Sequence, residues 1–411
     1  MAPSATEEAL ALIKRIEQFH NGSSGALETL SADTRRHLSE TARKLSLATE
    51  AEGDTVHRIV HSPLQLPLAV VGVETQLFDV LAKKKQNEKE GDRVATIAEL
   101  ASSTNVDPVL MRRLLRYYQS FGIVDQLEAD KFRANNITQA LVSPGAKYGV
   151  PFYLGTLVPA FNALPKFLRE KTGYANFTDG ANCPWYMGHN TDKQAFEWVK
   201  EAPNQMNLFM GWMVSQRDGL PMFLDVVDFE KEFAAQGVDE STPVFVDIGG
   251  AMGHQCIALR KRYPNLTGRV ILQDLDQVIQ QVKARPLPGF EGIETQSYSF
   301  FTPEPVKGAR AYYLRNILHD WPDDKCVEIL TNIKSAMTAE SRILIDEMVL
   351  PEKGAPWRAT QLDWAMGSCF AAMERSRSDW DSVLEKAGLK IVDIWKYTEQ
   401  LDDSIIVAVP K

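Results

Sequence analysis

The stretch that decides the fold reads Val244-Phe245-Val246-Asp247-Ile248-Gly249-Gly250-Ala251-Met252-Gly253-His254. It begins as a continuous apolar run of strand length, passes through a glycine-rich turn and ends where a helical pattern starts. Glycines in such a turn let a ligand approach the backbone, and the following helix N-terminus offers unpaired N–H groups. No Lys-Ser or Lys-Thr pair follows the turn, which argues against a P-loop. The stretch therefore predicts the start of a nucleotide-binding α/β domain.

The rest of the C-terminal half continues this alternation of strands and helices. Four more apolar runs of strand length follow, at Arg269–Leu272, Ala311–Leu314, Arg342–Asp346 and Ile405–Val409. Helical patterns lie between the runs, at His254–Tyr263, Leu275–Ala284, Asp323–Met337 and Arg377–Ala387. This order predicts an α/β fold with a Rossmann-like, doubly wound parallel sheet that is covered by helices on both faces.

Two of the predicted strands end in residues suited to ligand binding or catalysis. Asp274 closes the second strand, where a carboxylate can accept from both hydroxyls of a ribose, unless it caps the next helix instead. The third strand leads into Leu314-Arg315-Asn316-Ile317-Leu318-His319-Asp320-Trp321-Pro322-Asp323-Asp324. His319 is predicted to lie at the edge where open α/β sheets bind ligands, and an imidazole suits proton abstraction near neutral pH. Carboxylates of Asp346-Glu347 or Glu374 could fix its tautomer.

The N-terminal part is predicted to be mostly helical. Amphipathic patterns at Glu7–Phe19 and Leu27–Thr49 predict helices whose apolar faces pair with another subunit, and Leu68–Lys83 predicts a further helix. Thr96–Thr104 and Val109–Phe121 predict two helices joined by a turn, and a hairpin follows them, which is a winged-helix pattern. The arginines of the second helix could contact DNA phosphates, but packing or dimerisation fits this acidic chain better.

Three domains are predicted from these patterns. Residues 1–146 form an N-terminal helical and winged-helix dimerisation domain, and residues 241–411 form the Rossmann-like catalytic domain. Between them, residues 147–240 form a helical linker that is rich in aromatic residues and methionine. Such a stretch forms either a core or a pocket for a planar organic substrate, and we take it as the candidate substrate cradle.

The composition excludes several classes of function. The 411 residues include 45 Lys and Arg against 54 Asp and Glu, a net charge of −9 that disfavours broad binding to nucleic acid or membranes. The four cysteines show no metal-ligand spacing, so neither a disulfide framework nor a structural metal site is predicted. The sequence has no leader-like start and no apolar run of about 18 residues. We therefore expect a cytoplasmic protein with a small-molecule substrate.

Six ordered segments give the chain a specific resemblance. They are VDIGGAMGH, QDLDQVI, FFTPEP, LRNILHDWPDDKC, ILIDEMVLP and MERSRSDW, and they span Val246–Trp380. With them, and with the predicted winged helix, the chain resembles class I S-adenosylmethionine-dependent O-methyltransferases of the plant caffeic-acid and fungal secondary-metabolite type. The resemblance implies S-adenosylmethionine as cofactor and, together with the apolar N-terminal helices, a homodimer.

The resemblance also implies roles for single residues. Gly249 and Gly250 would approach the methionine part of the cofactor, Asp274 would hold its ribose, and Leu275 and Phe300 would flank its adenine. The full cofactor-binding set that we predict is Asp247, Gly249, Gly250, Asp274, Leu275, Ser299, Phe300 and Arg315.

The same resemblance implies a catalytic histidine. His319 would be the general base, with Glu347 and Glu374 as its orienting partners. It would remove a proton from a phenolic or enolic hydroxyl of a small secondary metabolite, whose oxygen would then take the methyl group in line. The resemblance implies no metal.

The chain departs from the family pattern at two positions. Ala251 replaces the third glycine of the turn, which is tolerable if its φ stays negative. Ser299 replaces an acid that accepts from the adenine amino group, and an uncharged acceptor predicts weaker cofactor binding.

A second reaction remains open. Some fungal members of this fold keep the cofactor but catalyse dehydration or pericyclic cyclisation, and here the sulfonium and Arg315 would polarise a carbonyl. The intact set of His319, Glu347 and Glu374 favours methyl transfer.

Overall fold

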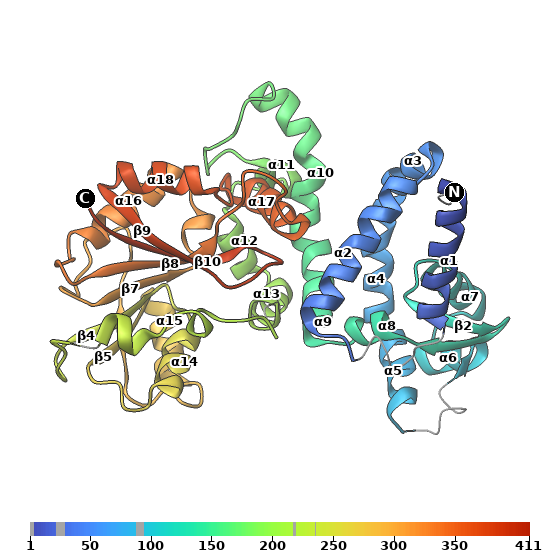
Figure 1. Cartoon of the computed structure of the whole chain (residues 1–411), viewed down its shortest axis with the longest axis horizontal. Helices are drawn as coiled ribbons and strands as arrows, with labels where there is room; N and C mark the ends of the chain where they lie inside the picture. Colours follow the sequence, from blue (N-terminus) through green and yellow to red (C-terminus); the bar gives the residue numbers. More distant parts are fainter. Residues whose placement is uncertain (1–3, 22–28, 88–93, 217–218, 235) are drawn as a thin grey trace. The chain divides into compact units, whose positions relative to one another are not determined.

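Figure 1 shows the computed structural model of the chain, which describes residues 4–21, 29–87, 94–216, 219–234 and 236–411. The chain divides into two compact units, Met1–Leu68 and Ala69–Lys411. Among the described residues no single helix has the length and apolarity to cross a membrane, although the bent pair Glu52–Glu74 and Leu77–Lys83 passes on length and composition alone.

The first unit consists of helices with exposed apolar side chains. It contains α1 (Ala5–Asn21), α2 (Ala32–Thr49), α3 (Glu52–His61) and the short 3₁₀ turn η1 (Ser62–Leu64). The two amphipathic helices predicted here are present, but the segment between them, residues 22–28, lies outside the described residues, and α3 was not predicted. Neither α2 nor α3 contains a buried residue. In the part of this unit that the structure describes, the helices therefore form no buried core of their own.

The helix predicted at Leu68–Lys83 is wrong, because two helices occupy this range. They are α4 (Gln65–Glu74) and α5 (Leu77–Asn87), and Gln76 between them has a left-handed backbone with φ of 58°. A Cβ at Gly72 would lie 2.3 Å from the ring of Phe78, so the glycine lets the two helices meet. The apolar residues keep their helical spacing across the bend at Gln76, so the sequence pattern did not reveal two separate helices.

The predicted pair of helices and hairpin is present. It comprises β1 (Ala95–Thr96), α6 (Ile97–Thr104), α7 (Pro108–Ser120), β2 (Val124–Glu128) and β3 (Lys131–Ala134). Thr96 and Glu99 form a capping box at the start of α6, and Asp107 caps α7 by accepting from the N–H groups of Val109 and Leu110. The strands pair antiparallel in the order β1-β3-β2.

A helical segment links this part to the large sheet. It contains α8 (Asn136–Leu141), α9 (Pro144–Phe152), η3 (Tyr153–Leu157), α10 (Val158–Phe167), η4 (Leu168–Thr172), α11 (Pro184–His189), α12 (Ala195–Glu201), α13 (Pro203–Ser215), η5 (Phe223–Asp225) and η6 (Glu230–Ala234). Phe152, Cys183 and Trp185 are buried in one cluster with Ala365 and Cys369 of α17 (Trp357–Phe370). Part of the aromatic stretch is therefore core.

The second unit is built on a sheet of seven strands. Their order is β6-β5-β4-β7-β8-β10-β9. The bounds are β4 (Pro243–Ile248), β5 (Arg269–Asp274), β6 (Ile293–Ser297), β7 (Ala311–Arg315), β8 (Arg342–Met348), β9 (Leu389–Lys396) and β10 (Asp403–Pro410). The strand order runs outward in both directions from the neighbours β4 and β7, so the loops after these two strands open beside each other at the carboxyl edge.

Helices cover both faces of this sheet, as Figure 1 shows. On one face Leu314 packs with Ile329 of α16 (Asp323–Lys334) and Val383 of α18 (Arg377–Lys386). On the other face Tyr313 packs with Leu259 of α14 (His254–Arg262), and α15 (Asp276–Ala284) lies on the same side. Neighbouring residues of β7 thus point to opposite cores, because side chains alternate along a strand. The doubly wound α/β prediction is confirmed.

The prediction of an all-parallel sheet is wrong in one strand. β10 runs antiparallel to both β8 and β9. A continuous apolar run predicts that a strand is buried on both faces, but it does not predict whether the strand runs parallel or antiparallel to its neighbours. The edge strands β6 and β9 were not predicted, because they carry charged and polar residues and lack a continuous apolar run. The helix α17 was not predicted either.

Candidate active site

The glycine turn after β4 is held between two neighbouring strands. The N–H groups of Gly249 and Gly250 donate to the carbonyl of Gln273 at 2.8 and 3.2 Å, which ties the turn to the end of β5. A Cβ at Gly249 would lie 2.7 Å from Ile317, and one at Gly250 would lie 2.5 Å from the carboxylate of Asp247. Both glycines are therefore required by packing.

Asp247 lies beneath this turn. Its side chain is 1% exposed and accepts a hydrogen bond from the Sγ of Cys256 at 3.5 Å. Burial raises the pKa of Asp247 to about 7, although the Cys256 hydrogen bond and the charge of Arg315 act in the opposite direction. Asp247, one of the predicted cofactor-binding residues, thus packs against the glycine turn at Gly250.

Ala251 adopts a left-handed backbone conformation, which an alanine disfavours and a glycine does not. Its φ is 49°, so the condition of a negative φ, under which alanine would be tolerable here, is not met. Its N–H donates to Oδ2 of Asp274 at 2.9 Å, which shows what this conformation achieves. The left-handed backbone points the amide at the neighbouring strand end.

Asp274 bridges the turn and the next helix. Besides the Ala251 amide it accepts from the N–H of Leu275 at 2.7 Å through Oδ1. Leu275 itself is the N-cap of α15, so the interpretation of Asp274 as the N-cap residue is wrong. Burial raises the pKa of Asp274. Two hydrogen bonds leave lone pairs on both carboxylate oxygens, because an ionised carboxylate offers about four acceptor sites.

Ser299 and Phe300 follow β6, and Phe300 lies next to the glycine turn. Phe300 is half-buried, and its ring comes within 3.9 Å of a Cβ position at Gly249. It also meets Trp321 edge to face with 6.0 Å between ring centroids. Ser299 is half-buried, and its carbonyl accepts from Thr302. Leu275, by contrast, is 49% exposed.

Arg315 at the end of β7 is a mostly buried cation. Its Nε lies 3.7 Å from the carboxylate of Asp346, and the Arg315 side chain is only 16% exposed. Both Tyr313 and Tyr397 donate their hydroxyls to Asp346. Burial lowers the pKa of Arg315, but the negative charge of Asp346, to which Tyr313 and Tyr397 both donate hydrogen bonds, outweighs it and raises the pKa. Asp346 therefore anchors Arg315.

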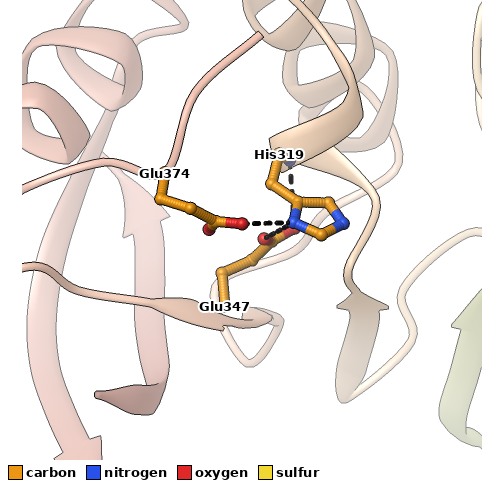
Figure 2. Close-up of side chains that lie close together, drawn as sticks. All are labelled: His319, Glu347 and Glu374. Carbon is orange, nitrogen blue, oxygen red and sulfur yellow. Dashed lines mark hydrogen bonds and ion pairs between the residues drawn. The ribbon is translucent and has the colours of Figure 1, made fainter. Parts of the chain in front are cut away.

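His319 lies in η7 (Leu318–Asp320) within a group of carboxylates, shown in Figure 2. Its Nδ1 lies 2.8 Å from Oε1 of Glu374 and 3.9 Å from Oε2 of Glu347. Its Nε2 lies 3.6 Å from Oδ1 of Asp320. Burial lowers the pKa of His319, but the charges of Glu374, Glu347 and Asp320 outweigh it and raise the pKa to about 10. The three predicted catalytic residues are thus in contact with one another.

Glu347 also holds the loop that carries the histidine. Its Oε1 accepts from the N–H groups of Ile317, Leu318 and His319 at 2.9, 2.8 and 3.4 Å. Its Oε2 is buried and makes no hydrogen bond within the described residues. Burial raises the pKa of Glu347 to about 7, and the charge of His319 lowers it.

Arg375 fixes the same loop from the other side and was not predicted. Its side chain is fully buried and donates to the carbonyls of Leu318 at 3.0 Å and Trp321 at 2.9 Å. It also binds Asp323 at 2.9 Å. Its position directly after Glu374 in the segment MERSRSDW was the one signal in the sequence that could have indicated its role.

The geometry of the histidine group allows two kinds of chemistry. The ligand atoms of His319, Glu347 and Glu374 lie within 4.8 Å of one another, a spacing that a metal ion could also use. The 2.8 Å distance between His319 Nδ1 and Glu374 Oε1 is that of a hydrogen bond between an imidazole and a carboxylate, as in general acid–base sites. The glycine turn and the histidine loop are connected through Ile317, which contacts Gly249.

Comparison with known proteins places this arrangement in a family. Residues 175–390 match the sequence profile of the O-methyltransferase domain. The O-methyltransferase lepI of Aspergillus flavus is 38% identical over 364 residues, covering 89% of this chain and 91% of that protein. Demethylsterigmatocystin 6-O-methyltransferase of Aspergillus parasiticus is 33% identical over 377 residues, covering 92% of this chain and 93% of that protein.

Solved structures agree with these sequence matches. The structure of LepI in complex with S-adenosylmethionine has a TM-score of 0.86 at 36% identity, covering 99% of this chain and 100% of that chain. A structure described as a pericyclic reaction enzyme has the same TM-score and identity, covering 98% of this chain and 100% of that chain. With its mostly parallel seven-stranded sheet and with relatives along nearly its full length, the protein belongs to the O-methyltransferase family of class I S-adenosylmethionine-dependent methyltransferases.

Proposed function

We propose that the protein transfers a methyl group from S-adenosylmethionine to a phenolic or enolic hydroxyl of a small secondary metabolite, with His319 as general base. The observation that carries this proposal is the 2.8 Å contact of His319 Nδ1 with Glu374, which leaves Nε2 to accept a substrate proton. The acceptor hydroxyl is proposed from the relatives, which include a 6-O-methyltransferase.

The residues at the carboxyl edge fit the cofactor. Gly249 leaves room for a close approach, and the two remaining acceptor sites of Asp274 suit the ribose hydroxyls. The exposed Leu275 and the half-buried Phe300 suit the two faces of adenine, with Ser299 beside them. Gly250 and Asp247 hold the turn in shape, and Arg315 supplies a cation at the end of β7. When bound, S-adenosylmethionine supplies a methyl group on a positively charged sulfur.

The protein's own residues then move one proton. Glu374 holds the Nδ1–H of His319, and Glu347 holds the loop amides, so the ring keeps its orientation. Nε2 accepts the proton of the substrate hydroxyl as the oxygen becomes a nucleophile. Because the carboxylates favour the imidazolium, His319 must lose a proton before each reaction, and a bound positive charge nearby lowers its pKa and assists that loss.

The test is incubation with methyl-labelled S-adenosylmethionine and an extract of candidate metabolites, read by mass spectrometry. We expect His319→Ala to reduce labelled product by about 10²–10⁴-fold while cofactor affinity, measured by calorimetry, is unchanged. The exposed His57→Ala serves as matched control and should keep full activity. Comparable methylation by His319→Ala would refute the general-base role.

A second candidate is cyclisation or dehydration without methyl transfer. Two buried cations at one sheet edge favour it: Arg315, and His319 in the imidazolium form that its carboxylates stabilise. Such cations polarise a carbonyl or donate a proton. In this case the product carries no label and is an isomer of the substrate or one water lighter. Arg315→Ala should then be more damaging than His319→Ala.

We also propose that the chain forms a homodimer through its N-terminal part. The described helices α2 and α3 bury no residue within the unit, and an apolar face such as that of Val56, Ile59 and Val60 requires a partner. In this proposal residues 1–146 are the winged-helix dimerisation domain, residues 147–240 the substrate cradle and residues 241–411 the catalytic domain.

A further inference from the structure

Asp320 is a third carboxylate beside His319, and it faces the nitrogen that the other two do not. Glu374 and Glu347 both approach Nδ1, at 2.8 and 3.9 Å. Oδ1 of Asp320 instead lies 3.6 Å from Nε2. Because Nδ1 is engaged with Glu374, Nε2 is the nitrogen that exchanges a proton with a substrate. The carboxylate next to the reacting nitrogen is therefore Asp320.

Among the described residues, the carboxylate of Asp320 has few interactions apart from that with His319. Within the described residues its one ion-pair partner is His319, and no side-chain hydrogen bond joins it to the loop. The neighbouring acid Asp323, by contrast, binds Arg375. The side chain of Asp320 is 19% exposed, whereas those of Glu347 and Glu374 are 0% and 1% exposed. Asp320 is thus the member of the group that water can reach.

We propose that Asp320 pairs with the Nε2–H of His319 that forms when the substrate proton is taken, and so stabilises the imidazolium produced by that step. The proposal rests on the general-base function proposed above. The O–H bond of the substrate breaks, the Nε2–H bond forms, and no electron is gained or lost. Glu374 accepts from Nδ1–H and Asp320 from Nε2–H, so both protons of the imidazolium have a carboxylate acceptor.

The electrostatics of the group agree with this geometry. The groups that face His319 are Glu347 from β8, Glu374 from the segment after α17, and Asp320 from η7. The guanidinium of Arg375 contacts the same loop, and Asp363 of α17 accepts the N–H of Glu374. Burial raises the pKa of Asp320 to about 6, and the charge of His319 lowers it, so Asp320 remains mostly ionised at neutral pH.

The first experiment needs no catalytic activity. The pKa of His319 is measured by NMR on histidine-labelled protein, with its signal assigned by His319→Gln. We expect Asp320→Asn to lower this pKa by about 1–3 units, because an opposite charge within a few ångströms has that effect. Asp324→Asn, an exposed acid of the same segment, is the matched control and should leave the pKa of His319 unchanged. An unchanged pKa in Asp320→Asn would overturn the proposal.

The second experiment measures turnover against pH. We expect Asp320→Asn to move the acidic limb of the profile to lower pH and to lower kcat by about tenfold or more on the plateau above the limb, with cofactor affinity unchanged. Asp320→Glu should restore part of kcat because it restores the carboxylate. Loss of kcat without any movement of the limb would show a structural role and refute the pairing. If the NMR shift occurs but no substrate is methylated, the pairing stands and the proposed methyl transfer fails.

Discussion

Ala251 carries local backbone strain at the glycine turn. A residue with a Cβ pays about 1–2 kcal/mol for the left-handed conformation that Ala251 adopts. Ala251→Gly should therefore raise the free energy of unfolding by up to about 1 kcal/mol, after the larger unfolded-state entropy of glycine is subtracted. Denaturant unfolding measures this change. The same substitution at Ala258, inside α14, is the control and should lower stability by about 1 kcal/mol. Equal losses in both variants would contradict the assignment of strain.

Asp247 makes stability depend on pH. Its pKa is raised by burial to about 7, above its ordinary value of 3.8, so the folded state binds more protons than the unfolded state between these values. Stability from this group therefore falls as pH rises from about 4 to about 7. Asp247→Asn should flatten that fall and gain most at alkaline pH, as measured by unfolding at several pH values. A gain that is the same at every pH would contradict this prediction.

His319 sets the direction of the pH profile. Its pKa, raised to about 10 by three carboxylates, keeps the imidazole protonated at neutral pH. A general base must be neutral, so the rate of methyl transfer should rise with pH from about 6 to about 10. A proton-donating histidine in the second candidate reaction would give a rate that is constant up to about pH 9 and falls only as the imidazolium loses its proton near pH 10. Measuring kcat/KM from about pH 6 to beyond pH 10 separates the two reactions, and a rate that already falls between about pH 6 and pH 8 would contradict both.

At the scale of elements, the loop of η7 depends on the fully buried guanidinium of Arg375. The fork of this side chain joins two carbonyls that flank the histidine, and a lysine cannot reach both. Arg375→Lys should reduce kcat by about tenfold or more and speed amide exchange in the loop, with little change in cofactor affinity. Arg377→Lys, whose ion pair with Asp381 is half exposed, is the matched control and should change neither quantity. A normal kcat in Arg375→Lys would refute the role of Arg375 in holding the loop of η7.

At the scale of the whole molecule, the apolar face of α3 decides the oligomeric state that we propose. Val56, Ile59 and Val60 are more than half exposed. Charged residues at two of them, Val56→Glu and Val60→Glu, should convert the dimer into a monomer with unchanged circular dichroism. Light scattering after gel filtration gives the mass, and His57→Glu on the same helix is the control. A wild-type monomer would refute the dimer, and an intact dimer in the double variant would place the interface elsewhere.

Local patterns were sufficient for much of the fold. The apolar runs predicted five strands of the large sheet, and the glycine turn marked the first of them, because burial on both faces requires continuous apolar sequence. The same signal could not reveal the direction of β10. It also could not reveal the edge strands β6 and β9, whose mixed polarity resembles that of a loop.

The candidate site divides in the same way. The sequence by itself determined the family through the order of its motifs, and it placed His319 and Glu347 near one another because parallel strands end at one edge. The place of Glu374 beside them was implied by the resemblance. Only the tertiary structure decided that Asp346 turns towards Arg315 while the adjacent Glu347 turns towards His319. It also decided that Arg375 donates to the carbonyls of the histidine loop and that Asp320 approaches Nε2 of His319. The physical reason is that side-chain direction and burial, which set these contacts and charges, arise from packing between segments that are distant in the sequence.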